Sequence, residues 1–168
     1  GDILYQCDVL MEPGETASEL HDRMASLGAS CLLQTLQQML TGQQQSIVQD
    51  HSQATYSKKM SKQDARIDWQ LSAEEIVLRV RAYNAWPVAF TYLEDMRLRV
   101  WRAQLLKTTV VADPGVVVGF SAQGLDVATG AGVVRITECQ RPGGKVLPIN
   151  DFFNSAQAKW LVGESRLV

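Results

Sequence analysis

The chain has 168 residues, of which 46% are hydrophobic and 20% charged, and it carries a net charge of −2 at neutral pH. This size and composition indicate a soluble protein of one domain, or of one small domain plus part of another. No apolar run approaches the roughly 18 residues that span a bilayer. Three widely spaced cysteines exclude a disulfide framework and a C-x-x-C metal motif, so we expect reduced, buried thiols in a cytoplasmic protein.

The charge is divided unevenly along the chain. Residues 1–57 carry seven acidic side chains against Arg23 alone, a net charge of −6. Residues 58–168 carry 15 Lys and Arg against 11 Asp and Glu, a net charge of +4. An acidic part followed by a basic part predicts two modules and favours an anionic partner for the second.

The first 42 residues contain a strand pattern and a helix pattern. Ile3–Met11 is rich in apolar residues and ends before Pro13 and Gly14, which predicts a strand. Thr16–Glu19 has the form of a capping box, and apolar residues follow at helical spacing as far as Gly42. A strand and one helix cannot bury their apolar faces alone, so this part is typical of the last piece of an α/β layer.

Residues 43–63 are polar, rich in Gln and Ser, and end in the basic segment SKKMSK, a composition typical of an interdomain linker. A second capping box follows, formed by Ser72 and Glu75. Apolar residues at 76, 77 and 80 predict one buried face of a helix, and Pro87 prevents that helix from continuing.

Short strands are predicted beyond Pro87. The segments VAFTYL, RLRVWRAQLL, GVVVGF, LDVAT and VVRITECQ are separated by turn sequences, and Arg97 and Arg99 alternate with apolar residues. Five strands with tight turns predict a small barrel, for which the oligonucleotide-binding (OB) type is the leading candidate. Asn150 is expected to cap a last short helix that runs to Lys159.

The residues offer little catalytic chemistry. GFSAQG is one residue too long for a G-x-S-x-G nucleophile elbow, and RPGGK lacks the spacing of a phosphate-binding loop. Arg141 and Lys145 in the second segment could still contact a phosphate, and a plain exposed turn is the alternative. His21 and His51 have no companion at ligand spacing, so we expect them to be surface residues.

The segment KKMSKQDARIDWQLSAEEIVLRVRAYNAWPVAFTYL, followed by LRVWRA, closely resembles the methionyl-tRNA formyltransferase family. The R-I-D-W and W-P blocks, at their mutual spacing, are the most specific part of this resemblance. It extends over essentially the whole chain, because GDILYQ and the helix after it look like the end of the catalytic domain and WLVGESRLV looks like the family's C-terminus. One departure is Ala85, where many relatives have proline.

The resemblance implies a fold and a domain order. Residues 1–42 would be an α/β remnant of a Rossmann-like formyltransferase domain, and residues 43–63 a linker with a basic end. Residues 64–168 would be a mainly β, OB-fold-like C-terminal barrel with a leading helix. Trp69, Trp86 and Pro87 are the expected structural anchors between linker and barrel. We expect core packing for both tryptophans, with base stacking as the alternative.

The resemblance also implies an activity. The family transfers a formyl group from 10-formyltetrahydrofolate to the methionine amino group of initiator Met-tRNA for translation initiation. Its catalytic Asn, His and Asp come from the first domain, and Asp2 of this chain matches a non-catalytic Asp of a D-x-G-D segment. The chain is therefore expected to hold none of the catalytic positions and no metal, to be inactive alone, and to leave formyl-donor binding to the preceding domain.

By the same resemblance, the chain positions the tRNA. We expect a cytoplasmic monomer with no membrane partner. The candidate phosphate contacts are basic residues of the linker, followed by two in the RPGGK loop: Lys58, Lys59, Lys62 and Arg66, then Arg141 and Lys145.

Other function classes stay open. The chain could be the C-terminal module of a related sugar-nucleotide or folate formyltransferase, although such an enzyme needs no lysine-bearing linker. It could be a stand-alone OB-type RNA-binding module, although that leaves the α/β remnant unexplained. A pure interaction domain would self-associate and show no salt-dependent binding of RNA.

Overall fold

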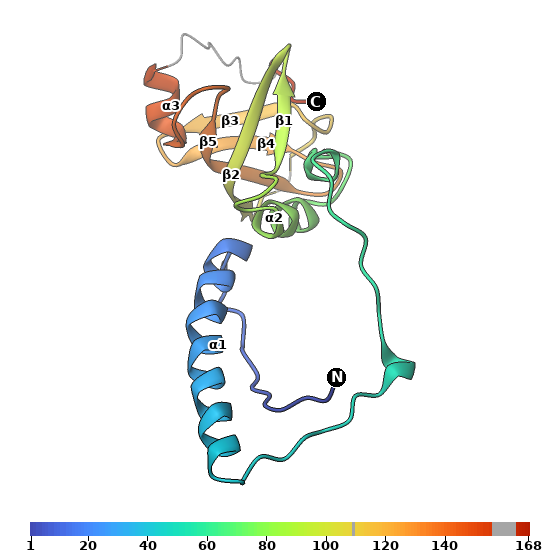
Figure 1. Cartoon of the computed structure of the whole chain (residues 1–168). Coiled ribbons are helices and arrows are strands. Elements are labelled where there is room, and N and C mark those ends of the chain that lie inside the picture. The colour runs from blue at the N-terminus through green and yellow to red at the C-terminus, as the bar shows by residue number, and fades with distance from the viewer. Residues whose placement is uncertain (109, 156–163) are drawn as a thin grey trace. The chain divides into compact units, whose positions relative to one another are not determined.

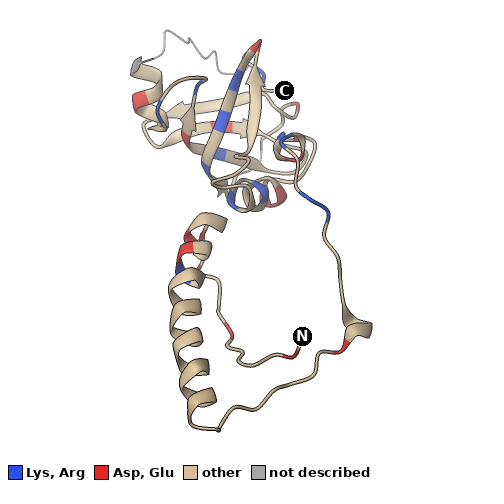
Figure 2. Cartoon of the chain, viewed as in Figure 1, with Lys and Arg blue, Asp and Glu red and all other residues tan. Residues whose placement is uncertain are grey.

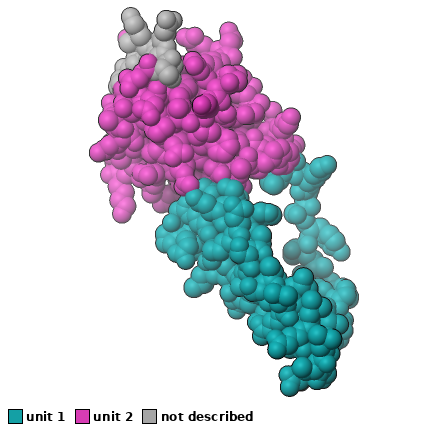
Figure 3. All heavy atoms as spheres, turned by 60° about the vertical axis from the view of Figure 1, so that its left-hand side comes forward, with its two compact units in different colours: residues 1–60 teal, residues 61–168 magenta. Residues whose placement is uncertain are grey.

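The computed structural model describes residues 1–108, 110–155 and 164–168 (Figure 1). The chain divides into two compact units, Gly1–Met60 and Ser61–Val168, which Figure 3 colours separately. Unit 1 denotes the first and unit 2 the second. The two units differ in secondary structure and in how much apolar surface they bury.

Helix α1 (Ala17–Leu40) is the main element of unit 1. Its N-terminus forms the predicted capping box: the Thr16 amide donates to Glu19 Oε2 at 2.8 Å, and the Glu19 amide donates to Thr16 Oγ1 at 3.4 Å. After the last turn, the Gly42 amide donates to the Met39 carbonyl at 3.2 Å, with Gly42 at a φ of +68°. The capping box and the glycine stop are therefore confirmed.

The predicted strand over Ile3–Met11 is wrong. Only Ile3 pairs, through an antiparallel bridge in which its amide donates to the Ile47 carbonyl at 2.8 Å and the Ile47 amide donates back at 2.9 Å. A strand needs a hydrogen-bonding neighbour along its length, and unit 1 supplies a single paired residue. Between α1 and the end of unit 1, the chain contains one 3₁₀ turn, η1 (His51–Gln53).

Unit 1 has no apolar core. Its buried side chains are those of Thr16 and Thr35, whereas apolar side chains of α1 are exposed, including Leu33 at 69% and Leu40 at 88%. The helix therefore presents an apolar stripe that nothing within residues 1–60 covers.

Unit 2 begins with a 3₁₀ turn, η2 (Gln63–Ala65), followed by helix α2 (Ala73–Ala82). The Glu75 amide donates to Ser72 Oγ at 3.3 Å and the Ser72 amide donates to Glu75 Oε2 at 3.2 Å, as predicted for a capping box. Ile76 is buried, as is residue 80 one turn later, while residue 77 packs against the same core. The predicted apolar face is thus confirmed.

Six strands form one antiparallel sheet: β1 (Phe90–Leu93), β2 (Met96–Leu106), β3 (Val117–Ser121), β4 (Gly124–Ala128), β5 (Val133–Gln140) and β6 (Leu147–Pro148). Their order is β1-β2-β5-β4-β3, with β6 paired to β5. The first five correspond to the predicted strands. Strand β6 was not expected, because two residues that include a proline carry no alternation signal.

Helix α3 (Ile149–Ser155) follows β6 directly. Because it starts at Ile149, Asn150 lies inside its first turn, and the prediction that Asn150 caps the helix is wrong. The predicted end at Lys159 lies outside the described residues.

Residues 165–168 join the two edges of the sheet. Along β1, the Val168 amide donates to the Tyr92 carbonyl at 2.9 Å and the Tyr92 amide donates back at 2.7 Å. At the start of β3, the Val117 amide donates to the Ser165 carbonyl at 2.9 Å. Main-chain hydrogen bonds therefore close the sheet on itself through a segment far away in sequence.

The core of unit 2 lies between the closed sheet and its helices. Leu98 and Val100 of β2 are at most 1% exposed, and they meet Ile136 of β5 and Phe152 of α3 in one cluster. Burying each such side chain contributes about 1.5–3 kcal/mol. This core fixes the outward direction of the alternate β2 residues, which the candidate site uses.

Candidate nucleic-acid interface

Trp69 holds the first segment of unit 2 in the core. Its ring is 4% exposed, and its Nε1 donates to Thr91 Oγ1 at 3.0 Å. The Thr91 hydroxyl in turn donates to the Val168 carbonyl at 3.0 Å, and the Ile67 amide donates to the Phe90 carbonyl at 2.8 Å. Core packing of Trp69 is confirmed. The chain that leaves the linker is thereby fixed to β1.

Trp86 and Pro87 behave differently from each other. Pro87 is buried, whereas the Trp86 side chain is 55% exposed. The expectation that Trp86 packs in the core is therefore wrong. The residues that enter the core after α2 are Val88 and Ala89, at 4% and 1% exposure.

The four candidate residues of the linker region are exposed, as solvent-facing phosphate contacts must be: Lys58, Lys59, Lys62 and Arg66. The first two belong to unit 1 and the other two to unit 2. Arg66 has a defined position, because its guanidinium lies 5.6 Å from the centre of the Tyr92 ring, within cation–π range. It is thus held at the edge of β1.

Arg141 and Lys145 lie in the loop between β5 and β6, and both are exposed. The loop has its own order: the Gly144 amide donates to the Arg141 carbonyl at 3.0 Å, and Gln140 Nε2 donates to the Gly144 carbonyl at 2.8 Å. The loop can therefore present both cations on a fixed turn.

Sequence reasoning missed a row of residues on the outer face of β2. Arg97 lies over the Phe90 ring, with its Cζ 3.7 Å from the ring centre, and Figure 2 shows Lys and Arg along this strand. Arg99 Nη1 and Trp101 Nε1 both donate to Gln140 Oε1, at 3.4 and 3.1 Å. The alternation of polar and apolar residues in RLRVWR predicts a strand, and it also places Arg97, Arg99 and Trp101 on one face of that strand.

The Gln140 side chain connects this row to the RPGGK loop. It accepts from Arg99 and Trp101 through Oε1 and donates to Gly144 through Nε2. Arg99 and Trp101 are two positions apart and share one face of β2, whose register shifts between Val100 and residue 102. The outer face of β2 and β5 therefore carries arginine and an aromatic ring together, a combination typical of nucleic-acid-binding surfaces.

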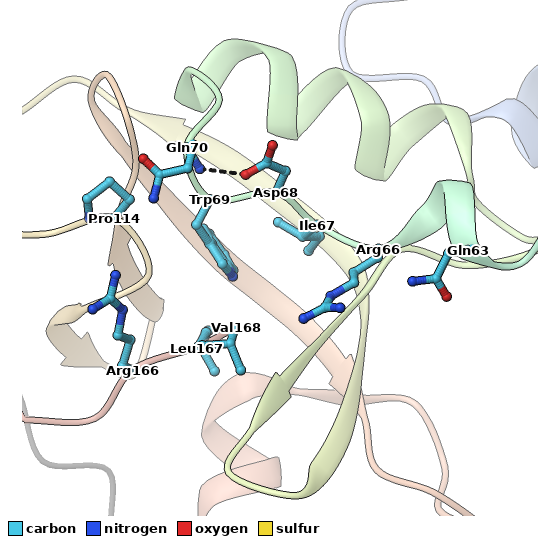
Figure 4. A pocket seen from close by; sticks show the side chains of 10 residues that line it. All are labelled: Gln63, Arg66, Ile67, Asp68, Trp69, Gln70, Pro114, Arg166, Leu167 and Val168. Atoms are coloured by element: carbon cyan, nitrogen blue, oxygen red, sulfur yellow. Dashed lines mark hydrogen bonds between the residues drawn. The ribbon is translucent and has the colours of Figure 1, made fainter.

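A pocket of about 430 Å³ opens in unit 2 beside Trp69 (Figure 4). It is lined by three segments: Gln63 with residues 66–70, Pro114, and residues 166–168. Arg66 and Arg166 lie on either side of Trp69 in Figure 4, and both are exposed. The lining carboxylate is that of Asp68, whose Oδ1 accepts the Gln70 amide at 3.0 Å.

The remaining chemical groups form no evident active site. Within residues 1–108, 110–155 and 164–168, no cluster of three His, Cys, Asp or Glu could hold a metal ion, and no helix is long and apolar enough to cross a membrane. His21 and His51 are exposed, as expected. Burial raises the pKa of the Cys139 thiol to about 12, which makes that group unreactive.

The expectation of three buried thiols is wrong for the other two cysteines. Cys7 is exposed and Cys31 is half-buried, and their Sγ atoms lie 3.5 Å apart. A hydrogen bond with Cys31 is the main cause that raises the pKa of Cys7. Both residues lie in unit 1, which lacks a core that could bury them.

Comparison with known proteins gives the family. The family described as formyl transferase, C-terminal domain, matches residues 59–157. The methionyl-tRNA formyltransferase of Hydrogenovibrio crunogenus is 39% identical over 165 residues, which cover 98% of this chain and 52% of that protein. The chain therefore belongs to the formyl transferase family, and it is a homologue of methionyl-tRNA formyltransferase. It spans about half the length of the curated relative that it matches.

Solved structures share the fold at lower identity. A variant of HypX from Aquifex aeolicus superimposes with a TM-score of 0.65 at 19% identity, over 86% of this chain and 27% of that one. Another HypX structure, in complex with tetrahydrofolic acid, gives a TM-score of 0.59 at 22% identity, over 75% of this chain and 22% of that one. At these identities the likeness concerns the fold alone.

Proposed function

We propose that this chain is the tRNA-positioning part of a methionyl-tRNA formyltransferase. The whole enzyme would transfer a formyl group from 10-formyltetrahydrofolate to the methionine amino group of initiator Met-tRNA in the cytoplasm. The observation that carries the proposal is the homology over 98% of the chain, linker included. The exposed basic residues that lead from this linker to the buried Trp69 support it.

The domain boundaries follow from this proposal. Residues 1–42 would complete the catalytic domain, and the exposed apolar stripe of α1 would be covered by the rest of that domain. Residues 43–63 would be the linker and residues 64–168 the C-terminal domain. The closure of its sheet by residues 165–168 supports an OB-like barrel.

The chain contributes positioning and no chemistry to the reaction. Formyl transfer needs a group that assists attack by the amine and donors that stabilise the tetrahedral oxyanion. We assign these to catalytic Asn, His and Asp residues outside the 168 residues, and we expect this chain alone to be inactive. Its own cations would neutralise phosphates and fix the orientation of the acceptor arm.

The phosphate contacts are assigned in two groups. Lys58, Lys59, Lys62 and Arg66 come first, because they are exposed and precede the anchored segment. Arg141 and Lys145 come second, and the neighbouring Arg99 joins them through Gln140. Such contacts set affinity and register, and they do not read the sequence of the RNA.

The main alternative is the C-terminal module of a formyltransferase that acts without tRNA. The fold shared with HypX, one structure of which holds tetrahydrofolic acid, is compatible with this alternative. The identity of 39% to a methionyl-tRNA formyltransferase, against 22% or less to the HypX structures given above, outweighs it.

A titration of the chain with initiator tRNA and with an elongator tRNA, at low and moderate salt, tests the proposal. We expect binding that weakens steeply with salt and that falls when residues 58, 59 and 62 are changed together to alanine. Lys107→Ala, which removes an exposed charge after β2, is the matched control and should change affinity little. Absence of binding to either tRNA at low salt would overturn the positioning role.

A further inference from the structure

The pocket beside Trp69 has walls that are already fixed. One wall is bonded to β1 through the Ile67 amide and the Phe90 carbonyl, and the opposite wall is bonded to β1 through Val168 and Tyr92. The Trp69 indole joins the two walls by way of the Thr91 hydroxyl. Because these bonds are main-chain or buried, the walls of the site are preformed, and a ligand would have to order only the exposed side chains at its rim.

The charges at the rim favour an anion. Arg66 and Arg166 are exposed at the mouth of the pocket, and neither forms an ion pair within the part of the chain that the structure describes. The acidic groups of the lining are already engaged: Asp68 accepts the Gln70 amide, and the terminal carboxylate of Val168 accepts from the Thr91 hydroxyl and the Tyr92 amide. A guanidinium matches phosphate with two parallel hydrogen bonds, so each of the two arginines is a candidate phosphate contact.

The volume indicates more than a bare anion. A cavity of about 430 Å³ lies within the range of roughly 300–1,000 Å³ that small-molecule sites occupy, whereas a phosphate alone would leave much of it empty. The lining also offers neutral hydrogen-bonding groups, the side-chain amides of Gln63 and Gln70, together with the carboxylate of Asp68. These groups suit the hydroxyls of a ribose and the edge of a base.

We propose that this pocket binds one nucleotide of an RNA chain, with its flanking phosphates at Arg66 and Arg166 and its ribose and base against Asp68 and Gln70. The inference rests on the proposed function, since it makes the pocket a contact of the tRNA. It adds a residue, Arg166, that lies 100 positions from Arg66 in the sequence and that no local pattern groups with Arg66.

The test uses the whole 168-residue chain and observes the indole N–H signals by NMR during titration with a short single-stranded RNA. The Trp69 indole should shift, because it lines the pocket, whereas a shift of the Trp101 indole alone would report binding at the outer face of β2. Arg66→Gln and Arg166→Gln should each weaken the binding of RNA about tenfold. Each should also lower by about one the slope of log affinity against log salt concentration. Lys107→Gln is the charge-matched control.

Three outcomes would overturn the inference. Inorganic phosphate that shifts Trp69 as strongly as the RNA would reduce the pocket to a simple anion site. An acidic peptide that binds better than the RNA would assign the pocket to a protein partner. No shift at Trp69 would exclude the pocket as a contact.

The pocket and the proposed function can fail separately. If tRNA binding still depends on the three linker lysines while Trp69 does not respond, the positioning role stands and the pocket assignment fails. If Trp69 responds to RNA in an Arg166-dependent way while the lysine variant binds tRNA normally, the pocket stands and the linker assignment fails.

Discussion

The Trp69 indole donates its Nε1 hydrogen to Thr91 Oγ1 at 3.0 Å in a buried site, which joins two residues 22 positions apart. The Thr91 hydroxyl in turn donates a hydrogen bond to the Val168 carbonyl. Three segments of unit 2 are thereby held together: the stretch before α2 that contains Trp69, β1 and the residues that close the sheet. The relationship explains how the exposed start of unit 2 is attached firmly to its sheet.

Thr91→Val should destabilise unit 2, because valine keeps the shape of threonine but leaves the Trp69 N–H without an acceptor. A buried donor without a partner costs about 1–3 kcal/mol in the free energy of unfolding. Urea unfolding followed by tryptophan fluorescence measures the difference. Thr91→Ser keeps the hydroxyl and should lose less, so equal stability of the valine variant and the native chain would contradict the prediction.

Gly130→Ala should also destabilise unit 2. A Cβ atom at residue 130 would collide with the main-chain oxygen of Gln70, and the Gly130 amide donates to the carbonyls of Trp69 and Leu71 at 2.9 and 3.0 Å. Overpacking of this kind costs about 1–3 kcal/mol, measurable by thermal unfolding.

Gly28→Ala provides the opposite case for glycine. Gly28 lies within α1, and a Cβ atom there would meet nothing within 4 Å. Alanine in a helix interior is favoured over glycine by about 1 kcal/mol, so helix content measured by circular dichroism should rise. A fall in helix content would show that this position is crowded in solution.

Cys139 should resist alkylation in the folded chain. Burial raises its pKa from 9.0 to about 12, whereas Cys7 is exposed and Cys31 is half-buried. Iodoacetamide at pH 8 should therefore modify residues 7 and 31 first and residue 139 only after unfolding, as read by mass spectrometry. Early modification of residue 139 would contradict its burial.

The same shift predicts a pH dependence. Because the folded state favours the neutral Cys139 thiol, its contribution to stability is intact below pH 9.0 and is lost as the pH rises toward about 12, where the unfolded chain gains by ionising. Cys139→Ala should flatten the stability profile in that range. The measurement is the urea midpoint of the native chain and of Cys139→Ala, determined at a series of pH values from pH 8 upward.

Amide exchange should separate the two units. Unit 1 buries no apolar side chain, whereas β2 and β5 lie in the core of unit 2. We expect rapid exchange across residues 1–57 and slow exchange in the two strands, since an isolated helix is marginally stable in water. Equally slow exchange in both units would show that unit 1 has a source of stability beyond its own contacts.

Local patterns predicted local structure well. Both capping boxes, the apolar face of α2 and the alternation around Leu98 depend on residues within a few positions of each other, so the sequence alone was sufficient for them. The residue sequence from Lys58 to Leu93 also resembles the family that the comparison with known proteins established.

Predictions that depended on contacts with residues far away in sequence were wrong in several places. The Ile3–Met11 strand failed because its pattern says nothing about whether neighbouring strands exist within the chain. The residue type of Trp86 favours the core, but its side chain is 55% exposed, and Val88 and Ala89 are buried instead. Composition also could not reveal that unit 1 would leave Cys7 exposed.

The sequence by itself determined α1, α2, the first five strands and the family resemblance, because each depends on short-range order along the chain. Only the tertiary structure decided that residues 165–168 close the sheet, and that Arg166 and Arg66 line one pocket. The physical reason is that hydrogen bonds across a sheet and the shape of a cavity depend on which distant segments meet, and no local period records that choice.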